Sequence, residues 1–115
     1  MSVRPVGKLN SDKKLVNSLL EQCKECRKRY EEHGQKVLKV VITNPNTWSY
    51  NRNDYGAIIT RYVDFDLYYE IAGVVVRIND CRCSQSNNGN GYDGWNTPFF
   101  QNADAYFSQI TDYKE

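Results

Sequence analysis

Residues 62–71 have the sequence YVDFDLYYEI, in which apolar and polar side chains alternate more regularly than anywhere else in the chain. Because successive side chains of a β-strand point to opposite faces, this alternation predicts a strand with one face in the core and the other in water. Ala72-Gly73 predicts a tight reversal, and residues 74–79 alternate again beyond it. An antiparallel β-hairpin is therefore expected at the centre of the fold.

A helix is expected on the N-terminal side of this hairpin. Ser11 offers an N-cap hydroxyl, and from Leu15 to Tyr30 apolar residues recur at intervals of three and four, which places them on one stripe of a helix. His33-Gly34 is typical of a helix end, because glycine adopts the left-handed conformation without steric cost. Residues 37–43 are β-branched and apolar until Asn44-Pro45-Asn46 interrupts them, which predicts a further strand.

The remaining segments complete the predicted fold class. Residues 1–10 show no periodicity and are expected to form an extended lead-in, and the asparagine- and glycine-rich residues 84–94 are expected to form a flexible loop. Thr97-Pro98 is typical of a helix start, and apolar residues from Phe99 to Tyr113 recur at helical spacing. The prediction is a single compact α+β domain over residues 1–115, with a three- or four-stranded antiparallel sheet and N-terminal and C-terminal helices packed on one face, in the order α-β-β-β-α. The residues expected to form its core are Leu15, Leu19, Val40, Ile42, Val63, Phe65, Leu67, Val74, Val76, Phe99, Tyr106 and Ile110.

The charge of the chain disfavours some partner classes. Fifteen Lys and Arg against fourteen Asp and Glu leave a formal charge of +1, so no net field draws the protein to nucleic acid or to a membrane surface. Lys24, Arg27, Lys28 and Arg29 cluster late in the predicted helix, but interleaved glutamates favour a salt-bridged solvent face. No apolar run approaches the roughly 18 to 20 residues that span a bilayer. Since the N-terminal residues also lack the features of a secretory signal, the expected location is the cytoplasm.

All four cysteines fall into two close pairs, Cys23 with Cys26 and Cys81 with Cys83. Two such pairs could supply a tetrahedral zinc site. The first pair lies on the apolar stripe of the predicted helix, where cysteine behaves as a small hydrophobic residue. The second pair would face away from the core unless a bulge at Asn79-Asp80 changes the parity of the strand. Free thiols are favoured over zinc and over a disulfide, and no cofactor is expected.

The polar face of residues 62–71 is the first candidate binding site. Tyr62, Asp64, Asp66 and Tyr68 are expected to project together from it. The two aspartates could share a divalent cation, as metal-dependent hydrolases require. No lysine occurs between Val40 and Tyr113 to assist such chemistry, however. Tyrosines among carboxylates instead favour a surface that docks on a protein, which is compatible with a solvated sheet face.

Trp48, Tyr50 and Arg52 form the second candidate site, in a segment predicted to be a loop. Aromatic and arginine side chains can stack on and clamp a base or nucleotide, although Trp48 could equally cap an edge of the core. His33, the only histidine, is expected to end a helix rather than to act in catalysis.

The predicted function is therefore that of a small non-catalytic binding protein that docks on a protein partner. A stoichiometric inhibitor of another protein, of the kind that phages and mobile elements encode, is one form of this function. Binding or sequestration of a nucleotide or nucleic acid is the alternative, and metal-dependent hydrolysis at Asp64 and Asp66 is the least favoured. No feature of the sequence indicates an oligomeric state.

Overall fold

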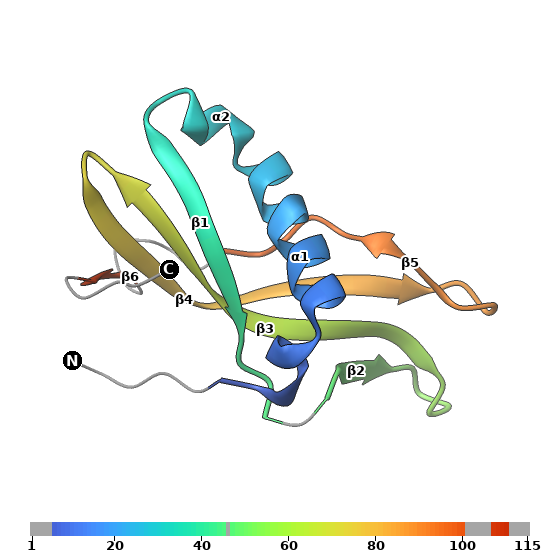
Figure 1. Cartoon of the computed structure of the whole chain (residues 1–115). Coiled ribbons are helices and arrows are strands. Elements are labelled where there is room, and N and C mark those ends of the chain that lie inside the picture. Colours follow the sequence, from blue (N-terminus) through green and yellow to red (C-terminus); the bar gives the residue numbers. More distant parts are fainter. Residues whose placement is uncertain (1–5, 46, 101–106, 111–115) are drawn as a thin grey trace.

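The computed structural model describes residues 6–45 and 47–100, together with the backbone of residues 107–110. Its elements are η1 (Lys8–Ser11), α1 (Lys13–Cys26), α2 (Lys28–Glu31), β1 (Gln35–Ile42), β2 (Ser49–Arg52), β3 (Ile58–Ile71), β4 (Val74–Asn87), β5 (Tyr92–Trp95) and β6 (Phe107–Ile110). The six strands form one antiparallel sheet, which is strongly curled, and α1 lies across one of its faces (Figure 1). The α+β class and the antiparallel sheet are confirmed.

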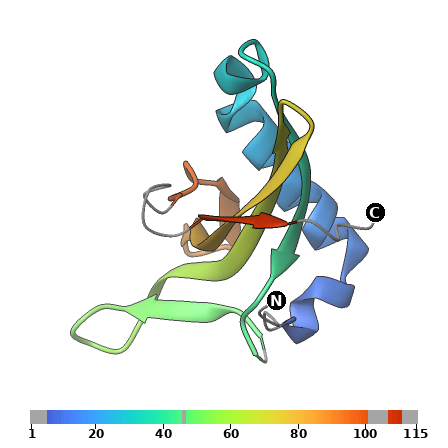
Figure 2. The same cartoon turned by 90° about the vertical axis from the view of Figure 1, so that its left-hand side faces the viewer.

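The long hairpin of β3 and β4 is the centre of the sheet, and each of its ends has its own outer strands. Near the 72–73 turn, β1 pairs with β3 and β6 pairs with β4. At the opposite end, β2 pairs with β3 and β5 pairs with β4. The turn itself has φ angles of 52° at Ala72 and 79° at Gly73, as a two-residue hairpin turn with both residues left-handed requires. Figure 2 shows how far the sheet bends between its two ends.

A β-bulge divides the central hairpin. The β3–β4 register shifts between Phe65, which pairs with Cys81, and Leu67, which pairs with Ile78, so Asn79 and Asp80 together oppose one residue of β3. Asp80 adopts a φ of 58° at this point. The extra residue changes the parity of β4, so the cysteines that follow it point into the core. A bulge at Asn79-Asp80 therefore turns Cys81 and Cys83 toward the core, which is the alternative that the sequence left open.

The N-terminal helix forms as predicted, with different ends. Asp12, not Ser11, is the N-cap residue, and its Oδ1 accepts the Leu15 N–H at 3.2 Å. The helix breaks at Arg27 before the single turn of α2, and Gly34, with a φ of 87°, follows as the expected C-terminal glycine. Leu19 and Cys23 are its fully buried residues and face the sheet.

Three predicted segments differ in the structure. Lys8–Ser11 of the predicted lead-in form a 3₁₀ turn, and residues 1–5 lie outside the described part. The predicted loop 84–94 is largely strand, because the ends of β4 and β5 pair with each other. The predicted C-terminal helix is not found in the described residues: Phe99 forms a β-bridge with Arg82 and 107–110 form β6, so pairing with β4 overrides the helical spacing. Residues 101–106 and 111–115 lie outside the described part.

The core lies between α1 and the sheet. Its buried side chains include predicted core residues from the N-terminal helix and from every predicted strand, namely Leu19, Val40, Ile42, Val63, Phe65, Leu67 and Val76. Two further predicted core residues, Leu15 and Val74, are partly buried against it. Phe99 is exposed and was assigned to the core wrongly, and the predictions for Tyr106 and for the side chain of Ile110 lie outside the described part.

Candidate binding site

The sheet face opposite α1 carries a cluster of charged and aromatic side chains centred on Arg82. Arg82 is the register partner of Asp64 across the β3–β4 ladder, and its Nε donates to Asp64 Oδ1 at 2.8 Å. Its guanidinium carbon lies 4.1 Å from the ring centroid of Tyr62. The hydrogen bond to Asp64 raises the pKa of Arg82, so the guanidinium is cationic at any physiological pH. The charge pair is half-exposed and accessible from solvent.

Phe99 stands beside this pair as a large apolar side chain in solvent. Its backbone N–H donates to the Arg82 carbonyl at 2.7 Å, and its carbonyl accepts the Arg82 N–H at 3.0 Å. Two residues bonded in this way on antiparallel segments point to the same face, so Phe99 projects outward next to Arg82. Its side chain is 58% exposed. A hollow of about 410 Å³ is lined by Asp64, Asp80, Arg82 and Phe99. These four residues and Tyr62 make up the Arg82 surface.

Asn44 fixes the backbone beneath this surface. It is buried just after β1, and its Oδ1 accepts the Asp64 N–H at 2.5 Å. Its Nδ2 donates to Ser49 Oγ at 3.0 Å and to the Tyr62 carbonyl at 3.5 Å. The side chain therefore bridges the end of β1, the start of β2 and β3. Sequence patterns indicate Asn44 only as an interruption of a strand, and they do not identify Arg82 or Phe99 as binding residues.

The four predicted residues of the β3 face do not form one surface. Tyr62 and Asp64 belong to the Arg82 surface, whereas Asp66 is fully buried, and its Oδ1 accepts the Asp80 N–H at 3.1 Å within the bulge. Tyr68 lies beyond the bulge, with Lys39 Nζ 4.9 Å from its ring centroid. The expected exposure of Asp66 was therefore wrong: the alternation of β3 continues, but the bulge in β4 packs against the Asp66 carboxylate and buries it. In the described part of the chain, no three His, Cys, Asp or Glu side chains are grouped as a metal site requires.

The predicted aromatic and arginine loop is in fact a packed end of the sheet. Trp48 stacks on Trp95, with ring centroids 5.6 Å apart. The guanidinium carbon of Arg61 lies 4.0 Å from the Trp48 ring and 3.9 Å from the Tyr92 ring. Arg61 also donates through Nε and a terminal nitrogen to Gln85 Oε1, at 2.9 and 2.7 Å. These side chains stack on and hydrogen-bond to one another, and Trp48 packs against the core, as expected for a cap on its edge.

Tyr50 and Arg52, the other two residues of that candidate, both lie on β2 but make different contacts. Tyr50 is exposed and lies opposite Arg61 in the β2–β3 register. Arg52 donates to the Gly56 carbonyl at 2.9 Å and so stabilises the turn between β2 and β3. The structure therefore does not gather Trp48, Tyr50 and Arg52 into a single clamp.

All four cysteines are free thiols, and Cys23, Cys81 and Cys83 belong to the buried core. Burial, followed by the electrostatic influence of Cys83, Cys81 and Cys26, raises the pKa of Cys23 well above its usual range. Burial likewise raises the pKa of Cys83 to about 12, and its thiol donates to the Asn96 carbonyl at 3.4 Å. Among the described residues, no three His, Cys, Asp or Glu side chains are placed to hold a metal ion together, so the geometry gives no support to the alternative zinc site at Cys23, Cys26, Cys81 and Cys83.

Comparisons with known proteins leave this geometry as the basis for any functional assignment. No protein-family model matches the sequence, and searches of curated proteins and of solved structures find no significant match. None of the described helices has both the length and the apolar character needed to cross a membrane.

Proposed function

We propose that the chain is a non-catalytic binding protein that docks on a protein partner through the Arg82 surface. The observation that carries this proposal is Phe99, a phenylalanine that is 58% exposed beside Arg82 and Tyr62. Aromatic residues and arginine are enriched at protein interfaces, and tyrosine and arginine dominate their energetic hot spots. Complete burial of such an apolar side chain contributes about 1.5 to 3 kcal/mol.

The geometry around Phe99 supports a protein as the partner. The hollow of about 410 Å³ beside it is open and shallow enough to take a side chain from another surface. Arg82 and Asp64 keep half-exposed polar atoms next to this hollow, as in interfaces with an apolar centre and a polar rim. The partner would therefore offer an apolar side chain to the hollow and hydrogen-bonding groups to the ion pair.

The proposal includes inhibition of the partner as one form of binding and the cytoplasm as the location. Free thiols, such as the four cysteines here, persist in a reducing compartment and support that location. Binding of a nucleotide through Trp48, Tyr50 and Arg52 is less supported, because Trp48 is already stacked against Trp95 and Arg61. Nucleotides that raised the melting temperature of the parent but not of Tyr50→Ala would favour that rival, because a ligand that binds only the folded state stabilises it.

The test is affinity capture with two baits, the parent protein and the variant Phe99→Ala. A genuine partner is retained by the parent and reduced on the variant. Measured with the purified partner, Phe99→Ala and Arg82→Ala should each weaken binding about 30-fold, as loss of a hot-spot residue does. Tyr55→Ala is the matched control, because Tyr55 is an aromatic residue that is 95% exposed away from this surface.

Unchanged unfolding curves for Phe99→Ala would show that the loss arises at the interface, since little of this side chain packs within the protein. If both Phe99→Ala and Arg82→Ala bind as tightly as the parent, the Arg82 surface is not the docking site.

A further inference from the structure

A second hollow lies on the α1 side of the sheet, away from the Arg82 surface. It has a volume of about 470 Å³ and is bordered by the C-terminal end of α1, by α2, by β3 and β4 and by the segment 97–100. Arg27, Arg29, Tyr30, Tyr69 and Phe100 supply its charged and aromatic lining, and define the Arg27 pocket. Its size falls within the roughly 300 to 1,000 Å³ of small-molecule sites.

Arg27 is held in place by aromatic rings. Its guanidinium carbon lies 4.7 Å from the ring centroid of Tyr30, 5.1 Å from that of Tyr69 and 5.2 Å from that of Phe100. Phe100 is in turn fixed by an edge-to-face contact with the core residue Phe65, with centroids 6.4 Å apart. The position of this cation is therefore set by the core, as a preorganised binding group requires.

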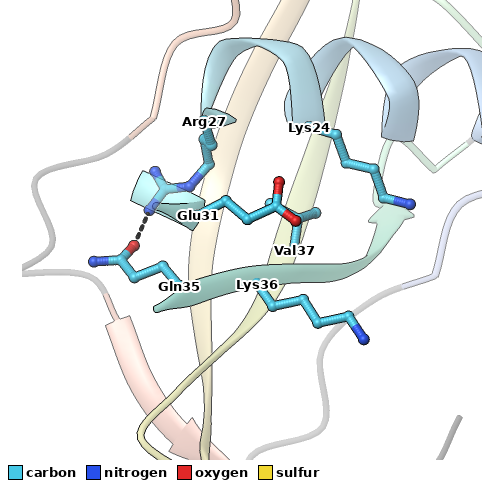
Figure 3. A pocket seen from close by; sticks show the side chains of 6 residues that line it. All are labelled: Lys24, Arg27, Glu31, Gln35, Lys36 and Val37. Atoms are coloured by element: carbon cyan, nitrogen blue, oxygen red, sulfur yellow. Dashed lines mark hydrogen bonds between the residues drawn. The ribbon is translucent and has the colours of Figure 1, made fainter. Parts of the chain in front are cut away.

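Among the described residues, few of the N–H donors of Arg27 have an acceptor. One terminal nitrogen donates to Gln35 Oε1 at 2.8 Å, the bond drawn in Figure 3. Its Nε is buried and has no hydrogen-bond partner among the described residues. A guanidinium has five N–H donors, and leaving a buried one unsatisfied costs about 1 to 3 kcal/mol.

The charges around Arg27 favour an anion. The guanidinium of Arg29 lies 5.7 Å from the same Tyr30 ring, so two cations flank one aromatic side chain. A small adjoining crevice of about 100 Å³, shown in Figure 3, is lined by Lys24, Arg27 and Lys36 but by only one carboxylate, Glu31. Within the described ranges, no carboxylate lies within ion-pair distance of Arg27 or Arg29.

We infer that the Arg27 pocket binds a small organic anion that carries a flat apolar group. The anionic head, a phosphate or a carboxylate, accepts hydrogen bonds from Arg27 and Arg29, since charge-assisted bonds from arginine to such groups are short and strong. The flat group packs against Tyr30 and Phe100, because aromatic faces bind planar apolar groups by offset or edge contacts. The site is independent of the Arg82 surface, which lies on the other face of the sheet.

The test uses phenyl phosphate as the probe, with inorganic phosphate and phenol as its two halves. Each is titrated into the full-length protein and followed by amide chemical shifts. We expect saturable binding of phenyl phosphate, at least about tenfold tighter than either half. The largest shifts are expected at Arg27, Tyr30 and Phe100, with Tyr62 and Asp64 of the Arg82 surface unaffected.

Matched variants decide whether the pocket is responsible. Arg29→Gln should weaken phenyl phosphate binding about tenfold, as expected for one lost charge-assisted hydrogen bond. Lys28→Gln removes the same charge from the preceding residue, which does not line the pocket, and should leave the affinity unchanged. Arg27→Lys keeps the charge but loses the planar fork, and should weaken binding in a protein whose fold is checked by circular dichroism.

Three results would overturn the inference: no saturable binding up to about 10 mM probe, equal losses in Arg29→Gln and Lys28→Gln, or shifts that map away from the pocket. Because the probes are small molecules, the outcome does not depend on whether a protein partner is found for the Arg82 surface.

Discussion

Replacing Asp66 with alanine is expected to destabilise the protein far more than replacing Asp64, although the two residues lie two positions apart on one strand. Asp66 is fully buried, and its carboxylate accepts the backbone N–H of Asp80 in the bulge. Alanine would leave that amide without this acceptor and leave a void, at a cost of about 2 to 4 kcal/mol. Asp64 forms a half-exposed ion pair with Arg82, so its loss should cost about 1 kcal/mol or less.

The assay is urea unfolding followed by circular dichroism, with the midpoint and slope determined for the parent and each variant. Asp66→Asn is the informative third variant, because it keeps both the size of the side chain and an acceptor oxygen, and should recover part of the loss. The reasoning is refuted if Asp64→Ala lowers the free energy of unfolding as much as Asp66→Ala does. It is equally refuted if Asp66→Ala stays within about 0.5 kcal/mol of the parent.

The remaining predictions concern other parts of the fold. Gly7→Ala should prevent normal packing and lower the melting temperature sharply, because a Cβ there would overlap the backbone carbonyl of Asn44; a melting temperature equal to that of the parent would contradict this. Ala72→Asn should raise the free energy of unfolding by about 1 kcal/mol in urea, since alanine is strained at a φ of 52° and asparagine tolerates it. Burial raises the pKa of Cys83 to about 12. The stability that the protonated Cys83 thiol contributes is therefore complete below the unfolded pKa of about 8.5 and is lost as the pH rises toward 12. Unfolding midpoints measured from pH 7 to 10.5 should fall less steeply in Cys83→Ala than in the parent, and identical slopes would disprove this.

The elements that sequence patterns predict well are those whose signals are local. Alternation in residues 62–71, the Ala72-Gly73 turn and the helical stripe from Leu15 each determine their own segment. The predicted C-terminal helix failed because its signals compete with a long-range interaction, the pairing of Phe99 and of β6 with the edge of β4. Helical spacing carries no information about a free strand edge elsewhere in the fold.

Only part of the Arg82 surface could be predicted from the sequence, for a related reason. Tyr62 and Asp64 follow from alternation alone, but Arg82 faces them only because β4 contains one extra residue. Counting back from the 72–73 turn without a bulge places Arg82 opposite Val63, on the core side. The observed register places it opposite Asp64. The position of a bulge depends on the backbone conformation of Asp80, which residue types alone do not determine.

The bulge also means that chain length, rather than residue identity, decides what β4 shows to solvent. Deleting Asp80 would remove a single exposed residue, yet every side chain from Cys81 to Asn87 would move to the opposite face of the sheet. Arg82 and Ser84 would then point toward α1, and the thiols of Cys81 and Cys83 would be exposed to solvent. A thiol-labelling reagent that reacts slowly with the parent should then modify Cys81 and Cys83 readily. In this part of the protein, insertions and deletions should therefore change the structure more than substitutions do, and substitutions of exposed residues should change it least.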